Sequence, residues 1–406
     1  MTNAAKLTDT LGGKQELPPA NVVPIAIAAG LLVIGFIALA YAVSWQKALL
    51  FLIGSGFGFA LLHGGFGFTA GWRAIVTRGD GRSLKMQLVV IAATMVAFIP
   101  ILQGYLPGER QYGGLIAPIS ITLLIGAFMF GIGMQLSNGC GSGTLFTLGG
   151  GSKRMLFTLP AFIFGSLLAT MHWSYWALPG VPAINLGKEF GVLGGIAVSL
   201  AGLAIAWFLV SWRENKMGSD NALLTASANA HHQTWPKRLW QGPWNLAWAA
   251  AALVVLNIAT LLIGQYPWAV TYGFALWGAN IAALAGVDVL SYDFWSWAKT
   301  TENLQGALVT NQQSVMNVGL ILGAMLAAGL AGNFFAAPWP TWRAIIAALI
   351  GGLLMGYGAR LSFGCNIGAF LGGIASGSVH GWVWFVSAFA GSLIGIKLRP
   401  FFDLKN

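Results

Sequence analysis

The sequence predicts an all-α integral membrane protein built from two inverted-topology repeats. Its composition is the first reason, because hydrophobic residues make up 57% of the 406 and charged residues only 8%. Soluble domains carry roughly 25% charged residues, so this chain lacks the polar surface that a soluble fold needs. The second reason is a set of continuous apolar stretches of membrane length, and the third is an internal repeat.

Apolar segments of about 20 residues favour membrane-spanning helices over an outer-membrane barrel, whose strands alternate over roughly ten residues. The sequence predicts nine such spans, at residues 22–43, 86–104, 115–136, 155–172, 190–211, 244–263, 314–332, 343–361 and 380–398. Four other apolar stretches, at residues 48–62, 141–150, 268–286 and 366–375, are short or interrupted by glycine. We therefore expect about nine spans and four short or re-entrant helices.

Hydrophilic segments divide the chain. We expect a polar tail at 1–20, a first transmembrane repeat at 21–212, a hydrophilic cytoplasmic linker at 213–242, a second transmembrane repeat at 243–398 and a cytoplasmic tail at 399–406. The first apolar run has no basic region before it and no clear small-residue cleavage site, so a cleaved signal peptide is not predicted.

The two halves repeat one another at a constant offset of 225 residues. "GAFMFGIGMQLSNGCGSGTLF" begins at Gly126, and "GGLLMGYGARLSFGCNIGAFL" begins at Gly351. The only two cysteines, Cys140 and Cys365, occupy the same position of this repeat. A thiol that recurs at equivalent positions is more readily explained by function than by packing alone.

Loop charges predict the orientation of the repeats. Residues 73–85 hold four basic residues and one acidic residue, a net charge of +3, whereas residues 288–312 hold three acidic residues and one lysine, a net charge of −2. Because basic loops stay in the cytoplasm, nine spans place the amino terminus outside and the carboxyl terminus inside. The repeats are then inverted. The basic residues thus indicate membrane orientation, and no nucleic-acid partner is expected.

Each cysteine follows a span that stops in a glycine-rich segment. Inverted repeats joined by broken helices commonly hold a substrate near the membrane midplane, so we expect Cys140 and Cys365 to meet there. A thiol is a weak donor and a soft surface, and the starts of short helices at Gly141 and Asn366 supply N–H groups that suit an anion. The predicted substrate-binding residues are Ser137, Asn138, Cys140, Gly141, Ser142, Ser362, Gly364, Cys365 and Asn366.

A small sulfur-containing oxyanion fits such a path. Arg360, five residues before Cys365, is either an interfacial anchor or a charge that attracts the anion. No catalytic residue, metal site or cofactor is predicted, and no Walker sequence is present.

These motifs resemble a known family. "GARLSFGCNIGAFLGGIASGS" at 358–378 and, more loosely, "GMQLSNGCGSGTLF" at 133–146 are similar to the paired signature of the YeeE/YedE family, the sulphur-transport domain. The resemblance extends over roughly residues 45–398. It implies an hourglass of nine spans plus short helices, in the inner membrane of a bacterium, that takes up thiosulfate or a related inorganic sulfur species. Cys140 and Cys365 match the two central cysteines, which in the family pass the anion inward through S–H hydrogen bonds.

One position departs from the family. Thiosulfate-importing relatives carry a further cysteine before Phe-Thr in the first half, where this chain has Gly67 before Phe68 and Thr69. A relay of three thiols is therefore absent. Either two thiols suffice, or the substrate differs, or the chain has diverged from thiosulfate transport.

Two other functions stay open. A membrane thiol oxidoreductase would use the two cysteines as a reversible disulfide, but the chain has no CxxC motif and no obvious pair of histidines in its spans. A membrane partner without bulk transport, of the kind some relatives linked to selenium metabolism suggest, would dock a cytoplasmic sulfur-carrier protein at the inner loops. Such a carrier could equally receive the anion from a working importer.

Overall fold

The computed structural model describes residues 18–218 and 235–406. Most of the predicted tail 1–20 and of the predicted linker 213–242 therefore lies outside the described residues. In the described part the chain is helical, apart from one short antiparallel pair formed by β1 (Ile119–Ser120) and β2 (Gly180–Val181). The predicted all-α class is confirmed.

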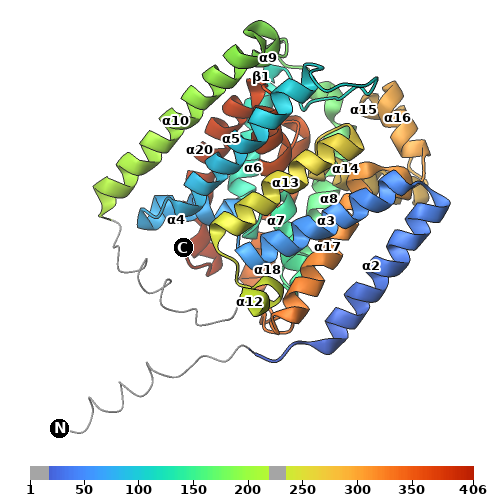
Figure 1. Cartoon of the computed structure of the whole chain (residues 1–406), viewed down its shortest axis with the longest axis vertical. Helices are drawn as coiled ribbons and strands as arrows, with labels where there is room; N and C mark the ends of the chain where they lie inside the picture. Colours follow the sequence, from blue (N-terminus) through green and yellow to red (C-terminus); the bar gives the residue numbers. More distant parts are fainter. Residues whose placement is uncertain (1–17, 219–234) are drawn as a thin grey trace.

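The helices fall into two lengths (Figure 1). The long helices are α2 (Val22–Ala42), α3 (Trp45–Gly64), α5 (Arg82–Leu102), α6 (Ile121–Ser137), α8 (Met155–Met171), α10 (Gly191–Met217), α13 (Leu246–Gly264), α17 (Gln312–Leu330), α18 (Trp342–Leu361) and α20 (His380–Leu398). The short helices in the interior are α4 (Phe68–Arg78), α7 (Gly141–Gly149), α14 (Val270–Leu284), the π-helix η4 (Asn366–Gly372) and α19 (Gly373–Ala375). Shorter surface elements include α9 (Leu186–Glu189), α12 (Trp235–Gln241), α15 (Asp293–Ser296), α16 (Ala298–Gln305) and the 3-10 turn η5 (Arg399–Phe402).

Nine stretches of the described chain are long and apolar enough to cross a membrane, as predicted. Their membership differs from the prediction. Residues 48–62 lie in α3, a helix of 20 residues that continues into α4 in one such stretch, whereas the predicted span 155–172 forms the shorter apolar helix α8, with 17 residues. Together with α8, the long helices of the described residues number ten, one more than the nine predicted spans. The glycines of α3 serve helix packing. A Cβ on Gly54 would lie 2.8 Å from Met316 Cα, and one on Gly58 would lie 2.8 Å from Ala324 N, both on α17. The short-segment prediction for residues 48–62 is therefore wrong.

This additional helix changes the position of the amino terminus. The Asn21 N–H donates to the Gly329 carbonyl at 2.8 Å, and the Asn21 side chain accepts from the Phe334 N–H at 3.1 Å. At the other chain end, Arg343 pairs with Asp403 at 3.2 Å. Phe334 and Arg343 flank the short connection from α17 to α18, so both chain ends lie on one face of the bundle, which we call the terminal face. An outside amino terminus with an inside carboxyl terminus does not fit this arrangement, because α2 and α3 form an antiparallel hairpin that returns the chain to the same face. The side of the membrane on which this face lies stays a prediction.

Helices of the two halves pack in reciprocal pairs. α6 packs against α18, α8 packs against α18, and α20 packs against α6 in the corresponding way. Likewise α2 and α3 pack against α17, while α10 and α13 pack against α5. Asn138, the residue that follows the end of α6, contacts Arg399 on the terminal face. α18, in contrast, begins on the terminal face, at Trp342. The equivalent helices thus run in opposite directions, as inverted repeats require. Where along the chain the first repeat ends stays a prediction.

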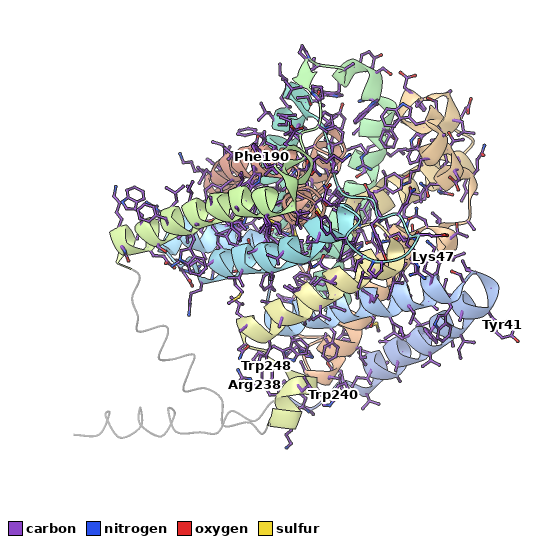
Figure 2. The ribbon with its side chains drawn as sticks, turned by 45° about the horizontal axis from the view of Figure 1, so that its top comes forward. Tyr41, Lys47, Phe190, Arg238, Trp240 and Trp248 are labelled. Atoms are coloured by element: carbon purple, nitrogen blue, oxygen red, sulfur yellow. The ribbon has the colours of Figure 1, made fainter. Side chains whose placement is uncertain are left out.

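The periphery suits a lipid environment. α2 and α10 are largely exposed along their apolar lengths, with Leu193 at 82% and Phe208 at 68% exposure. Figure 2 shows that the Tyr41 side chain, at the tip of the α2–α3 hairpin, points away from the protein. Trp240 lies on α12, far from this tip. Exposed aromatic residues of this kind are typical of the membrane–water boundary.

Candidate functional site

Both central helices end at a residue in the left-handed conformation. α6 ends at Asn138 with φ 67°, and α18 is followed at the equivalent position by Phe363 with φ 60°. Asn adopts this conformation readily, whereas it is strained for a bulky Phe. Two residues later, Cys140 and Cys365 adopt extended backbone and cap α7 and η4. The helix break therefore places each thiol at the start of a short helix.

The two thiols meet inside the bundle. Cys140 is 2% exposed, Cys365 is fully buried, and both are free. Cys365 packs against Gly141, the residue that follows Cys140, because a Cβ at Gly141 would lie 3.0 Å from Cys365 Sγ and 3.1 Å from Thr271 Cγ2. Cys140 Sγ lies 3.5 Å from Ser142 Oγ and accepts the Gly143 N–H at 3.4 Å. The amide at the start of α7 thus already serves the sulfur of Cys140.

Two of the predicted donors serve the protein scaffold. The Ser137 hydroxyl donates to the Gly139 carbonyl at 3.0 Å. The Ser362 hydroxyl donates to the Gly358 carbonyl at 2.7 Å and accepts from Trp384 Nε1 at 3.0 Å. Gly364 is required by the backbone conformation, because its φ is 152° and a Cβ at this position would lie 2.7 Å from the Ala369 nitrogen.

The two predicted asparagines differ. Asn366, directly after Cys365, is fully buried, and neither its Nδ2 nor its Oδ1 has a hydrogen-bond partner. A buried amide left unpaired costs roughly 1–3 kcal/mol, so an arriving polar ligand would relieve this cost. Asn138 instead accepts hydrogen bonds from Arg73 at 3.0 Å and Arg399 at 3.3 Å on the terminal face.

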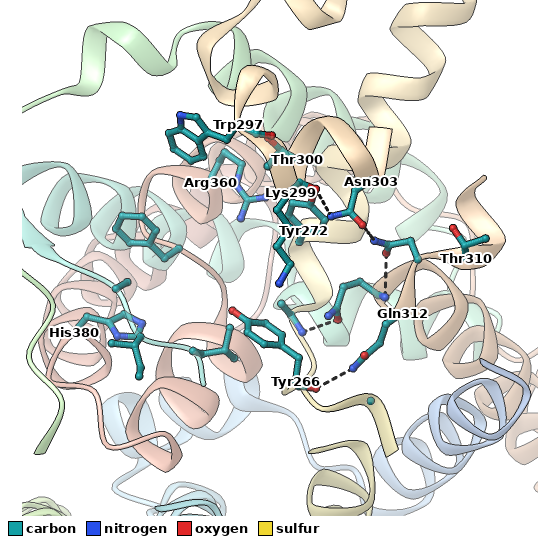
Figure 3. Close-up of a pocket in the computed structure, with 18 of the residues that line it drawn as sticks. Tyr266, Tyr272, Trp297, Lys299, Thr300, Asn303, Thr310, Gln312, Arg360 and His380 are labelled. Atoms are coloured by element: carbon teal, nitrogen blue, oxygen red, sulfur yellow. Dashed lines mark hydrogen bonds between the residues drawn. The ribbon is translucent and has the colours of Figure 1, made fainter. Parts of the chain in front are cut away.

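A cavity of about 500 Å³ lies at the opposite end of α18 (Figure 3). Its lining carries three cationic side chains, Lys47, Lys299 and Arg360, together with the amide side chains of Asn303, Asn311, Gln312 and Gln313. In Figure 3 Arg360, Tyr272 and Lys299 stand close together, while His380 lies on the opposite wall. Because α18 begins on the terminal face, this cavity opens toward the other face, which we call the cavity face.

Arg360 links this cavity to the thiols. Its guanidinium lies 5.7 Å from the ring centre of Tyr272 and 5.4 Å from that of Phe294, in cation–π geometry. The side chain is 7% exposed, and its Nε and Nη1 have no hydrogen-bond partner. It lies in the last turn of α18, five residues before Cys365, and both side chains are buried. Of the two roles considered for Arg360, this position favours the attraction of an anion.

The remaining cavity residues were not found from the sequence. Tyr266 lies in the turn between α13 and α14, where burial raises the pKa of its phenol and keeps it a neutral donor at physiological pH. Gln312 holds this turn by donating to the Tyr266 carbonyl at 2.9 Å. The signal in the sequence that indicates these cavity residues is the cluster of amide side chains in "TNQQS" at 310–314.

Gly67 lies at the start of α4, at the position where the related importers carry cysteine. A Cβ at this position would meet only Ala70 Cβ, at 3.6 Å, so the backbone would accept a side chain. In the described ranges no group of three His, Cys, Asp or Glu side chains is arranged to hold a metal.

Comparison with known proteins adds the following. A sequence profile for sulphur transport matches residues 63–394. The chain is 34% identical over 175 residues, 42% of its length, to the probable transporter YedE of Salmonella typhimurium. It is 36% identical over 140 residues, 34% of its length, to the probable transporter YedE of Escherichia coli K12. These matches span 41% and 34% of the relatives' own lengths. The thiosulfate transporter TsuA of Spirochaeta thermophila is 26% identical over 352 residues, 82% of this chain and 92% of that protein.

Proposed function

Because the chain belongs to the sulphur-transport family, we propose that it imports thiosulfate or a related small sulfur oxyanion through a central path between Cys140 and Cys365. The observation that supports the proposal is that both thiols are buried, each at the start of an interrupted helix, with Cys365 packed against the residue that follows Cys140. The similarity to a thiosulfate transporter over most of both chains supports the substrate class.

The anion is first attracted into the cavity by Lys47, Lys299 and Arg360. Arg360 then draws it toward Cys365, where the unpaired amide of Asn366 offers a donor in a buried site. A charge buried among rings acts more strongly than one in water, because the local dielectric is low.

The thiols provide weak hydrogen-bond donors along a narrow passage. A thiol has an ordinary pKa of about 8.5, so at pH 7 it is mostly S–H and donates to the anion. Binding in a permeation path must be favourable enough for the anion to arrive and weak enough for it to leave. Soft donors on each side of Gly141 meet both conditions.

The orientation is part of the same proposal. The terminal face carries the basic loop 73–85, so it is cytoplasmic, and both chain ends lie inside the cell at the bacterial inner membrane. The cavity then faces outward and receives the anion. A cytoplasmic sulfur-carrier protein is a candidate acceptor on the terminal face.

The closeness of the thiols also favours one other function, a thiol oxidoreductase. The two functions make opposite predictions for Cys→Ser variants, since a hydroxyl still donates a hydrogen bond but forms no disulfide. Transport by hydrogen bonding therefore predicts residual flux in Cys365→Ser, whereas a disulfide mechanism predicts none.

The test is uptake of ³⁵S-thiosulfate by bacterial cells that lack other thiosulfate importers. Cells with the chain should accumulate label, and unlabelled thiosulfate should compete for uptake more effectively than sulfate. Accumulation no greater than in cells with an empty vector would reject thiosulfate as the substrate. Competition by sulfite and by selenium analogues would then identify the related anion.

A further inference from the structure

A group of arginines surrounds the end of α6 on the terminal face. Arg73 comes from α4, Arg154 precedes α8, and Arg399 follows α20. Arg73 and Arg399 donate to the Asn138 side chain at 3.0 Å and 3.3 Å, and Arg154 donates to the Leu136 carbonyl. Three segments far apart in the sequence thus bring three guanidinium groups to the end of α6. Asn138, which accepts from two of them, precedes Cys140 by two residues in the sequence. We call these residues the arginine cluster.

The positive charge of the arginine cluster is not balanced by carboxylates. The ion pairs in the part of the chain that the structure describes join Arg82 to Asp80, Lys85 to Glu214 and Arg343 to Asp403, and none includes a cluster arginine. Burial, together with the charge of Arg73, lowers the pKa of Arg154 to about 10, which still leaves it protonated at neutral pH. The three groups therefore repel one another.

Capping of α6 accounts for only part of this charge. A helix carboxyl end has a partial charge of roughly −0.5, so one cation would be enough to compensate it. Arg399 donates to the Gln135 carbonyl at 2.6 Å and through its Nε to the Lys405 carbonyl at 3.2 Å, so its nitrogens have partners, but these partners are neutral. Arg154 Nε is buried without a partner. The positive charge of the cluster and this one donor therefore remain for something that the described residues do not supply.

The repeat relation adds an independent argument. At the offset of 225 residues, the position of Arg360 corresponds to Gln135. The first repeat thus lacks the helix-borne arginine of the second repeat, yet Gln135 accepts a hydrogen bond from Arg73 at 3.4 Å. Guanidinium groups therefore lie beside both interrupted helices, one toward the cavity face and three toward the terminal face.

We propose that the arginine cluster is a second binding site for a small divalent oxyanion, separated from the cavity by the two thiols. The inference rests on the proposed function for its role, which is to receive the anion after it passes Cys140 and hold it before release. Guanidinium groups recognise oxyanions through paired N–H bonds, which fits sulfate-like geometry.

The test measures anion protection of arginines in the purified chain, in nanodiscs of phosphatidylcholine. Phenylglyoxal modification of each arginine is followed by peptide mass spectrometry, with thiosulfate and sulfate as separate probes. At an anion concentration of about ten times the dissociation constant, mass action lowers modification of Arg73 and Arg399 about tenfold. Arg82, which is half-exposed and paired with Asp80, is the matched control and should not change.

Equal modification with and without either anion would overturn the proposal. Protection that requires phosphatidylglycerol in the nanodisc and no added anion would overturn it too, in favour of a lipid headgroup site. If the cluster arginines do not react, equilibrium dialysis of labelled sulfate decides, because Arg399→Gln should bind about tenfold more weakly than Arg82→Gln. Equal binding by these two variants would reject the site. Sulfate protection in a chain that imports no thiosulfate would reject the proposed function and leave the site standing.

Discussion

Gly141→Ala is the sharpest steric test of the path. The added methyl would lie 3.0 Å from Cys365 Sγ, 3.1 Å from Thr271 Cγ2 and 3.3 Å from Cys365 Cβ. Optimal separations between such atoms are roughly 3.5–4.0 Å, so the methyl would press on the side chains of Cys365 and Thr271.

The expected size of the effect follows from this overlap. Overpacking of this kind costs typically about 1–3 kcal/mol, a part of the roughly 5–15 kcal/mol by which folded proteins are stable, so the chain should still fold. An anion that must displace the methyl meets a barrier raised by a similar amount. At 1.36 kcal/mol per factor of ten, uptake should slow by about 5- to 150-fold.

The assay is initial ³⁵S-thiosulfate uptake, normalised to the amount of folded protein in the membrane. Gly368→Ala is the matched control, because its methyl would meet only Ala269 Cα, at 3.9 Å, in the same region. Uptake by Gly141→Ala equal to that of Gly368→Ala would refute the reasoning, since the anion would then not pass between the thiols.

Three further predictions concern the outer charge, the missing thiol and the topology. Arg360→Gln should lower uptake at limiting thiosulfate by about tenfold or more, because a unit charge about 4 Å from an anion contributes roughly 4 kcal/mol at an effective dielectric of 20, and a loss of about 1.4 kcal/mol is already tenfold. Arg360→Lys should retain more uptake than Arg360→Gln, and equal loss in both would contradict an electrostatic role. Gly67→Cys should fold normally, since its side chain meets only Ala70 within 4 Å, and should raise thiosulfate uptake; unchanged uptake would show that two thiols suffice. Reporter domains fused to either chain end should report the same side of the membrane, and opposite sides would contradict the shared terminal face.

The repeat made the centre of the fold predictable. Cys140 and Cys365 recur at one offset, and inverted repeats bring equivalent positions together, so the sequence predicts that the two thiols lie close to one another. Both thiols are buried at the start of a short helix, and an anion path between them stays a prediction. For Arg360 the sequence leaves two alternatives, an interfacial anchor or a charge that attracts the anion, and its burial in the last turn of α18 favours the second. The hydroxyls of Ser137 and Ser362 were assigned to the path on composition alone, and the structure gives them backbone partners.

The number of times that the chain crosses the membrane is harder to predict from the sequence. Trp45–Gly64 carries Lys47 near its start and three glycines in its middle, which make its apolar part look short in the sequence. Only packing shows why those glycines are there, since Gly54 and Gly58 touch the backbone of α17. One missed pass reverses the side of the amino terminus, because orientation depends on whether the number of passes is odd or even.

The arginine cluster could not be predicted from the sequence. Arg73, Arg154 and Arg399 lie on three separate segments, and each alone is typical of a basic anchor at a membrane boundary. Their convergence on the end of α6 depends on the packing of α4 and α20 around this helix.

Labelled thiosulfate flux into liposomes that contain this chain as their sole protein tests the central claim most directly. Wild type should give flux above empty liposomes, and Cys140→Ala and Cys365→Ala should each reduce it at least about tenfold, the size expected for loss of roughly 1.4 kcal/mol of stabilisation in the narrowest part of the path. Undiminished flux in both alanine variants would contradict a path between the two sulfurs.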